Sequence, residues 1–313
     1  MAKYENFSPL LDKTSEDIIY LLSLDSRQSI SDLARTLHIS RRIVEQRYNK
    51  IFAKKYVKPL LIANFANTLK VTVFLKLVPF DTKILEELKK IKSLVKAKET
   101  LGQYDLSLLF FPKHKEELDT ILHHINTLCH ESLQNIDVVF HEFEDTLGYK
   151  SFCHKPLFLS KYKMLTSQKI TLGKQDFIVV EELLRNPLAS TKEIMNQTQL
   201  GYKTITDTLH KFKEQASLRF SVDPDYGKLG LEFHNLLVKI NLGKQSLFEN
   251  NIVRNQRVHW IKRGTGSWDY ILSIPAQSIS EFIDITRDIR ATNRESILQC
   301  SALISKIHVE RKL

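Results

Sequence analysis

Residues 25–52 read DSRQSISDLARTLHISRRIVEQRYNKIF, and this stretch decides the fold of the first part of the chain. Isoleucine and leucine recur at helical spacing just before it, at residues 18–22, which predicts a first helix. Ser29 or Ser31 caps a second helix. Ser40 caps a third helix, whose inward face carries Val44, Tyr48 and Ile51. Three such helices form a helix-turn-helix, in which the third helix enters the major groove of DNA.

The third helix leaves basic side chains exposed near its start. Arginine suits this position, because its planar fork matches both guanine and phosphate oxygens. Residues 26–58 hold nine Lys or Arg against two acidic residues, a net charge of +7 that is typical of a nucleic-acid surface. The alternative is a solvated basic face on an ordinary helical bundle. We expect DNA contacts from Arg27, Ser29, Ser40, Arg41, Arg42, Gln46, Arg47 and Lys50.

The helical pattern returns 161 positions later, with its core preserved. The matched apolar pairs are Leu33 and Ile194, Ala34 and Met195, Ile39 and Leu200, Val44 and Ile205, Tyr48 and Leu209, and Ile51 and Phe212. The arginines are not preserved: Tyr202, Lys203 and Thr208 stand at the positions of Arg41, Arg42 and Arg47. Residues 187–219 hold five basic and three acidic residues, a net charge of +2. The second unit therefore keeps its fold signal and loses much of its DNA signal.

A strand-rich unit follows each helical unit. In the first, we expect strands at 71–78, 95–100, 106–111 and 136–143, with helical stripes at 84–91 and 118–128. In the second, we expect strands at 235–241, 258–263, 270–274 and within 303–309, with helices at 247–253 and 279–289. The order β-α-β-β-α-β is that of a ferredoxin-like unit.

The predicted fold class is α+β, with two winged helix-turn-helix units that are each followed by a ferredoxin-like unit. We place the first pair at residues 10–65 and 66–147, and the second pair at 172–226 and 227–313. The join at 148–171 is basic, aromatic and too apolar for a free linker, so we expect it to pack across the two halves.

The first helical unit resembles the Lrp/AsnC family of transcription regulators. The matching residues are Asp25, Arg27, Ser29, Leu33, Ala34, Ser40, Val44 and Arg47. The resemblance implies a sequence-specific DNA-binding regulator that assembles at least as a homodimer. This chain departs from the family where the recognition helix ends, because Lys55 and Tyr56 stand where the family has glycine.

Two turns resemble the glycine–x–aromatic–aspartate turn of the family's RAM domain, where small effectors such as amino acids bind between domains. The residues are Gly102, Tyr104, Asp105, Gly266, Trp268 and Asp269. The resemblance implies that a small effector binds between RAM units. We expect such a site near these turns, where Trp268 can stack on a ligand or fill the pocket and the aspartates can take an ammonium group. A purely structural hairpin explains the motif equally well, because glycine permits the turn and aspartate satisfies loop amides.

An enzyme of the same architecture is the second alternative. Siroheme decarboxylases resemble Lrp/AsnC proteins and can carry the unit in tandem. Their signature, an arginine-rich approach to a strand with Asn-x-Met-x-Val-Trp, is only faintly echoed by HNLLV at residues 234–238. A phosphate-binding glycine loop and a nucleophile elbow are also missing. We therefore expect a protein that is not an enzyme and that needs no cofactor; a scaffold without DNA contact is the third alternative.

Charge and composition bound the remaining possibilities. The net charge of +10 favours a polyanionic partner, here double-stranded DNA. Apolar runs fall short of the roughly 18 residues that span a bilayer, and the first ten residues lack the apolar core of a signal peptide. Three widely spaced cysteines fit reduced thiols in the cytoplasm. The grouping His123, His124, Cys129 and His130 lacks zinc spacing, so we expect no metal site.

Overall fold

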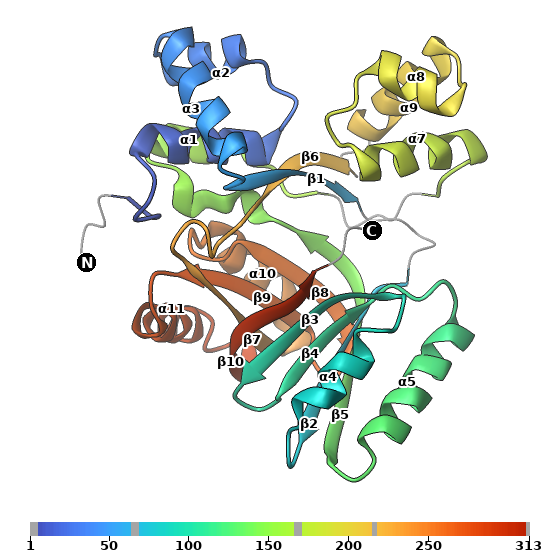
Figure 1. Ribbon diagram of the computed structural model, residues 1–313. Coiled ribbons are helices and arrows are strands. Elements are labelled where there is room, and N and C mark those ends of the chain that lie inside the picture. Colours follow the sequence, from blue (N-terminus) through green and yellow to red (C-terminus); the bar gives the residue numbers. More distant parts are fainter. Residues whose placement is uncertain (1–5, 64–68, 166–170, 215–217, 311–313) are drawn as a thin grey trace.

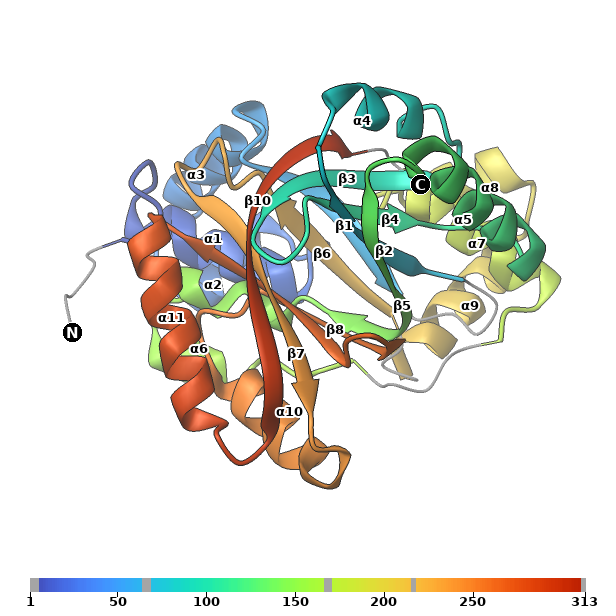
Figure 2. The same ribbon diagram turned by 90° about the horizontal axis from the view of Figure 1, so that it is seen from below.

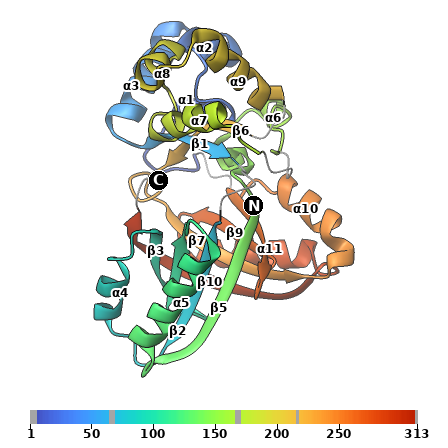
Figure 3. The same ribbon diagram turned by 90° about the vertical axis from the view of Figure 1, so that its right-hand side faces the viewer.

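Each half of the chain begins with three helices that pack as a head. The computed structural model describes residues 6–63, 69–165, 171–214 and 218–310. The first head comprises α1 (Lys13–Leu24), α2 (Ile30–Leu37) and α3 (Arg41–Ala53), and the second head comprises α7 (Lys174–Arg185), α8 (Thr191–Thr198) and α9 (Tyr202–Glu214). Both heads lie on the same side of the molecule, above the strands (Figures 1 and 3).

The two heads place matched residues alike. Val44 and Ile205 are both fully buried, and so are Leu33 and Ile194. The turn before each third helix also matches, because His38 and Gln199, which are 161 positions apart, both adopt left-handed backbone with φ of 56° and 60°. Serines begin α2 and α3 as expected, with the Ser29 hydroxyl accepting from the amide of Asp32 and the Ser40 hydroxyl accepting from that of Ile43.

The wings of the two heads form one sheet. Strand β1 (Val57–Ala63) pairs antiparallel with β6 (Leu218–Pro224). Each strand also reaches the opposite head: Leu61 and Ala63 of β1 lie in the apolar core of the second head, and Val222 of β6 lies in that of the first. Before β1, Lys55 takes the left-handed conformation with φ of 54°. Lysine therefore ends the helix where glycine usually does.

Eight strands close into a barrel below the heads (Figure 2). The first unit supplies β2 (Val71–Leu77), β3 (Leu94–Leu101), β4 (Leu106–Phe110) and β5 (Leu133–Asp145), and the second supplies β7 (Glu232–Ile240), β8 (Trp260–Gly266), β9 (Tyr270–Ala276) and β10 (Ile297–Glu310). Their order around the barrel is β10-β3-β4-β2-β5-β8-β9-β7. The two units therefore join twice, through β5 with β8 and through β3 with β10.

Strands β5 and β10 are longer than the sequence indicates. We expected 136–143 and a strand within 303–309, whereas the strands cover 133–145 and 297–310. Each of them pairs along one part with its own unit and along another part with the other unit. The apolar pattern of one unit does not reveal the second partner.

Helices cover the outside of the barrel, as the predicted fold class requires. Helices α4 (Thr82–Leu88) and α5 (Lys115–Cys129) pack on the strands of the first unit. Helices α10 (Gln245–Arg254) and α11 (Ile279–Thr292), with the short η2 (Leu242–Lys244) before α10, belong to the second unit, where α10 and α11 pack on its strands. The predicted α+β fold class is confirmed. Within the described ranges, no helix is long and apolar enough to cross a membrane.

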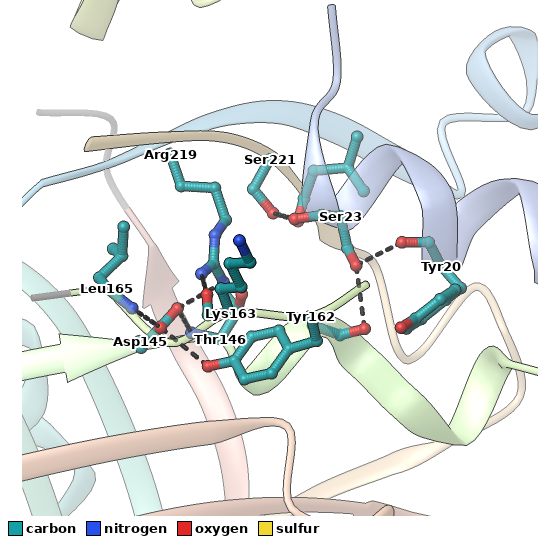
Figure 4. Close-up of polar contacts among 11 residues, drawn as sticks. Tyr20, Ser23, Asp145, Thr146, Tyr162, Lys163, Leu165, Arg219 and Ser221 are labelled. Carbon is teal, nitrogen blue, oxygen red and sulfur yellow. Dashed lines mark hydrogen bonds and ion pairs between the residues drawn. The ribbon is translucent and has the colours of Figure 1, made fainter. Parts of the chain in front are cut away.

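We call residues 147–165 the connecting segment. It packs against both halves, as predicted for the join at 148–171, of which residues 166–170 lie outside the described ranges. It contains η1 (Leu147–Phe152) and α6 (Pro156–Leu159). Phe152 and Phe158 enter the core of the first head, whereas Leu147 and Leu165 enter the core of the second ferredoxin-like unit. Figure 4 shows the polar contacts that hold the segment, centred on Asp145.

The connecting segment covers one face of α1 but not the matching face of α7. On α1, the Tyr20 hydroxyl donates to the carbonyl of Phe158, and the Ser23 hydroxyl donates to that of Gly148. Glu16 and Asp17 also accept hydrogen bonds from His154 on this face. The matching residues of α7 are Phe177, Ile178, Glu181 and Leu184, and all four are exposed. The two heads therefore differ most in what covers their first helix.

Candidate nucleic-acid interface and effector site

The start of α3 presents exposed basic side chains. Arg41, Arg42 and Gln46 are exposed, whereas Val44 on the inner face is fully buried. Lys50 is exposed one turn further on. The helix lies in the first head, above β1 and the barrel (Figure 1). This arrangement leaves the arginines accessible to a large polyanion.

Three other residues of the predicted interface have local structural contacts. Ser29 and Ser40 cap α2 and α3, and the Ser29 hydroxyl also donates to the carboxylate of Asp32. The Arg47 guanidinium lies 2.7 Å from the Asp12 carboxylate at the start of α1, and its side chain is 31% exposed. Arg47 therefore ties the recognition helix to the first helix of the same head.

Arg27, which we expected at the DNA interface, contacts the second head. Its guanidinium donates to the carbonyl oxygens of Pro187 and Ala189 in the second head, at 3.0 and 2.9 Å. It also lies 3.8 Å from the centre of the Phe220 ring on β6. Burial lowers the pKa of Arg27. This arginine joins the two heads.

The second head presents less charge at the equivalent surface. At the start of α9, Tyr202 is 63% exposed and Lys203 is exposed. Thr208 is buried and donates to Asp176, and Lys211 lies 2.6 Å from the same carboxylate. Asp176 is on α7, so these contacts tie the second recognition helix to its own head. Lys203 and Lys213 remain exposed there.

The two glycine–x–aromatic–aspartate turns meet inside the barrel. The Trp268 indole N–H donates to the Tyr104 hydroxyl at 2.9 Å, and that hydroxyl donates to the carboxylate of Asp137. Tyr104 is fully buried, and Trp268 is 2% exposed. Burial raises the pKa of Tyr104, and Asp137 raises it further. The aromatic residues therefore lie at the predicted junction and fill it, which is one of the two roles expected for Trp268.

The two aspartates hold strand ends in the same way in each unit. Asp105 accepts from the amide of Leu77 at 2.8 Å, and its other oxygen lies 3.1 Å from the Lys76 ammonium group. Asp269 accepts from the amide of Ile240 at 2.9 Å and lies 3.0 Å from the Lys239 ammonium group. Each aspartate does take an ammonium group, but from its own unit. Gly102 and Gly266 have φ of 142° and 131°, which few other residues adopt.

A cavity of about 480 Å³ lies beside the second turn. Its lining includes Gly266 and Asp269 of the predicted effector set. The other polar lining residues are Glu142, Lys239, Gln245, Arg263, Thr265 and Tyr270. Its charged residues pair with each other, because the Lys239 ammonium group lies 3.0 Å from Asp269 and the Arg263 guanidinium lies 3.6 Å from Glu142. Sequence reasoning missed these residues, although Lys239 was detectable, because Lys76 and Lys239 both lie near the end of the first strand of a ferredoxin-like unit.

Comparisons with known proteins give two kinds of similarity, although no family model matches the chain. A stretch of 124 residues is 25% identical to the HTH-type transcriptional regulator FL11 of Pyrococcus abyssi (strain GE5 / Orsay), and covers 37% of this chain and 81% of that protein. This match supports the expected homology to Lrp/AsnC regulators.

The whole chain also shares its fold with an enzyme. A crystal structure of the siroheme decarboxylase NirDL covers 96% of this chain and 93% of its own, with a TM-score of 0.58 and 11% identity. The same enzyme in co-complex with an iron-uroporphyrin III analogue covers 96% of this chain and 94% of its own, with a TM-score of 0.56 and 12% identity. At this identity the likeness shows the fold alone.

The expectation that this protein is not an enzyme is contradicted by the structural comparison. It relied on the weak match to the decarboxylase signature at residues 234–238 and on the missing glycine loop and nucleophile elbow, and not on the tandem arrangement of helix-turn-helix and ferredoxin-like units. The same arrangement along nearly the whole chain occurs in a decarboxylase. The fold is therefore compatible with both classes of protein.

Proposed function

We propose that this protein is a sequence-specific DNA-binding transcription regulator of the Lrp/AsnC type, in which the first head makes most of the DNA contacts. The observation that carries the proposal is the exposed pair Arg41 and Arg42 at the start of α3. The first turn of a recognition helix is the part that reaches base edges in the major groove. The similarity to the regulator from Pyrococcus abyssi supports the proposal.

Binding to DNA is tested with the full-length protein. Duplexes are selected from a random library, and the affinity for the selected duplex is measured by fluorescence anisotropy at several salt concentrations. Arg41→Ala and Arg42→Ala should each cost about 1–3 kcal/mol if the side chain reads a base. Lys203→Ala is the matched control, because Lys203 occupies the position of Arg42 in the second head. Failure to select any sequence, or equal losses in both heads, contradicts the proposal.

Two further parts of the proposal are self-association and an effector. We place self-association on the exposed apolar face of α7, and an assembly of two chains would carry two strongly basic heads. The cavity beside Asp269 is the place for a zwitterionic effector such as an amino acid. Calorimetry against a panel of amino acids tests the effector. If wild type and Arg263→Gln bind an amino acid equally tightly, the effector site does not lie in this cavity.

A second candidate function is a tetrapyrrole enzyme related to the siroheme decarboxylases. The observation that favours it is the shared fold over 96% of the chain. The test is the absorption spectrum of the purified protein after incubation with an iron-uroporphyrin III analogue and gel filtration. A retained Soret band supports the enzyme, and its absence together with selected DNA binding supports the regulator.

A further inference from the structure

An isoleucine lies exposed on the first turn of the recognition helix of the first head. Ile43 is the third residue of α3, directly after Arg41 and Arg42, and it is 43% exposed. It does not belong to the apolar core of this head, in which Val44 and Ile51 of the same helix are fully buried. A lone exposed isoleucine is ordinary on a protein surface, so its neighbours decide whether it has a role.

Ile43 lies beside the polar side chains that we expect to contact DNA. Residues three or four positions apart are neighbours on the surface of a helix. Ile43 is therefore next to Gln46, and Gln46 is next to Arg42. All three side chains are exposed, whereas Val44 between them faces the core. The outward face of the first two turns of α3 thus combines an apolar group with two hydrogen-bonding groups.

The polar neighbours of Ile43 are not used to hold the head together. Other arginines of this head form ion pairs within it: Arg35 lies 3.1 Å from Asp32, and Arg47 lies 2.7 Å from Asp12. Within the described ranges, the side chains of Arg42 and Gln46 form neither an ion pair nor a hydrogen bond. They therefore remain available to a partner outside the chain.

The three side chains match chemical groups that base pairs present in the major groove. Arginine binds N7 and O6 of guanine, glutamine binds N7 and N6 of adenine, and an apolar side chain contacts the C5-methyl group of thymine. Contacts to phosphate are made by charged or hydrogen-bonding groups, and isoleucine has neither. The chemistry of Ile43 therefore suits a base edge and not the DNA backbone.

The second head does not repeat this combination. Thr204 lies 161 positions after Ile43 and is half-buried, and Tyr202 and Lys203 stand at the positions of Arg41 and Arg42. An apolar contact from this turn is therefore a property of the first head.

We infer that Ile43 is a specificity-determining residue, whose side chain contacts the C5-methyl group of a thymine in the DNA site. The inference rests on the proposed DNA binding by the first head and specifies part of what that head recognises. Contact with the isoleucine removes the methyl group from water, and this burial favours thymine at that position.

The test uses the full-length protein and the duplex selected from a random library. Each thymine is replaced in turn by uracil, which keeps the base pair and removes only the methyl group. At one thymine of the half-site, we expect wild type to bind about fourfold more weakly, which corresponds to roughly 0.8 kcal/mol for one buried carbon group. The same replacement should leave the affinity of Ile43→Ala unchanged, because that variant has already lost the contact.

Two variants serve as controls. Ile43→Val keeps a branched apolar side chain, so it should remain sensitive to the thymine methyl group. Thr204→Ala changes the matched position of the second head and should show the same ratio of affinities for thymine and uracil as wild type. Thermal unfolding verifies that each variant is folded.

The outcomes distinguish this inference from the proposed function. If no duplex is selected, both fail. If a duplex is selected and Arg42→Ala weakens its binding, DNA binding by the first head stands. The inference about Ile43 is then overturned if no uracil replacement lowers the affinity of wild type, or if folded Ile43→Ala loses as much affinity as wild type at every thymine.

Discussion

The guanidinium group of Arg219 on β6 lies 2.7 Å from the carboxylate of Asp145 at the end of β5. Both side chains are buried, at 8% and 0% exposure. The second oxygen of Asp145 accepts from the Tyr162 hydroxyl at 2.9 Å and from the Leu165 amide at 2.8 Å (Figure 4). One buried carboxylate therefore fastens the wing, the barrel and the connecting segment together.

Replacing this arginine should destabilise the whole chain. Arg219→Met leaves Asp145 as a buried charge without its counter-ion, and we expect a loss of about 3–5 kcal/mol in the free energy of unfolding. Urea denaturation measures it. The control is Arg185→Met, whose pair with Glu181 is 65% and 48% exposed and should cost under about 1 kcal/mol. Equal losses in both variants would show that the buried pair contributes no more than the exposed one.

Arg27→Ala separates a joining residue from a DNA-contacting residue. We expect a loss of about 1–3 kcal/mol in the free energy of unfolding, because two carbonyl oxygens of the second head lose a charged donor. The salt dependence of DNA binding should stay unchanged, whereas each lost phosphate contact lowers its slope by about one. A weaker salt dependence of DNA binding, with an unchanged free energy of unfolding, would show that Arg27 contacts DNA.

Lys55→Gly should stabilise the first head. Lys55 has left-handed backbone with φ of 54°, which costs a residue with a Cβ about 1–2 kcal/mol and costs glycine little. Part of that gain is lost to the greater freedom of glycine in the unfolded chain. We expect a net gain of about 0.5 kcal/mol in the free energy of unfolding. Lys54→Gly, at φ of −78°, should give a loss instead, and a gain from both would point to another cause.

Stability should rise with pH in the acid range, partly through His141. Burial lowers its pKa to about 3, whereas the unfolded chain binds the proton near pH 6.5. Between these values the unfolded state holds more protons, so stability is lost as pH falls, by up to about 1.4 kcal/mol per pH unit. His141→Gln should flatten the curve of unfolding free energy against pH. His234 and His259, with lowered pKa values, contribute in the same direction and remain in that variant.

Glu144 extends the same dependence to lower pH. Burial raises its pKa, but Lys70 and Lys262 outweigh this and hold the pKa at about 2. Its stabilising contribution is present above pH 4.5 and is lost as pH falls towards 2. If the free energy of unfolding of His141→Gln changes with pH between pH 4 and 6 as steeply as that of wild type, burial does not lower the pKa of His141.

Phe177→Asp should prevent self-association. Phe177 is 57% exposed on α7, beside Ile178 at 39% and Leu184 at 38%. A charge there would have to lose its solvent in a dimer, so we expect a monomer by light scattering where wild type is a dimer. Leu157→Asp is the control, because Leu157 is 80% exposed elsewhere. A dimeric Phe177→Asp places the interface on another face.

Repeated local patterns were sufficient to predict most of the fold. Periodicity located the helices of both heads, and the order of strands and helices gave the ferredoxin-like units. The pairing of β5 with β8 was harder to predict. Strands pair through backbone hydrogen bonds, so the side chains of β5 do not reveal that a second strand lies along its other edge. Lys55 shows the same limit, since its left-handed backbone is imposed by the chain reversal before β1 and not by its own preference.

The candidate sites were predicted less completely than the fold. Arg41 and Arg42 lie exposed where the pattern placed them. Arg27 and Trp268 have the residue types of binding groups, yet both contact the other half of the chain. Their roles depend on which surfaces the two halves bury together, and that information is not contained in a single unit.

Strands β1 and β6, the wings of the two heads, form one sheet within a single chain, and this changes how the stability of the assembly depends on protein concentration. When two separate chains build such a sheet, dilution separates them and the assembly falls apart. Here β1 and β6 belong to one polypeptide, so their pairing is an internal event whose equilibrium ignores protein concentration. Covalent joining also frees each head from having to match an identical copy. One head can then keep its arginines while the other loses them. The two heads stay joined even when the protein is present at low concentration.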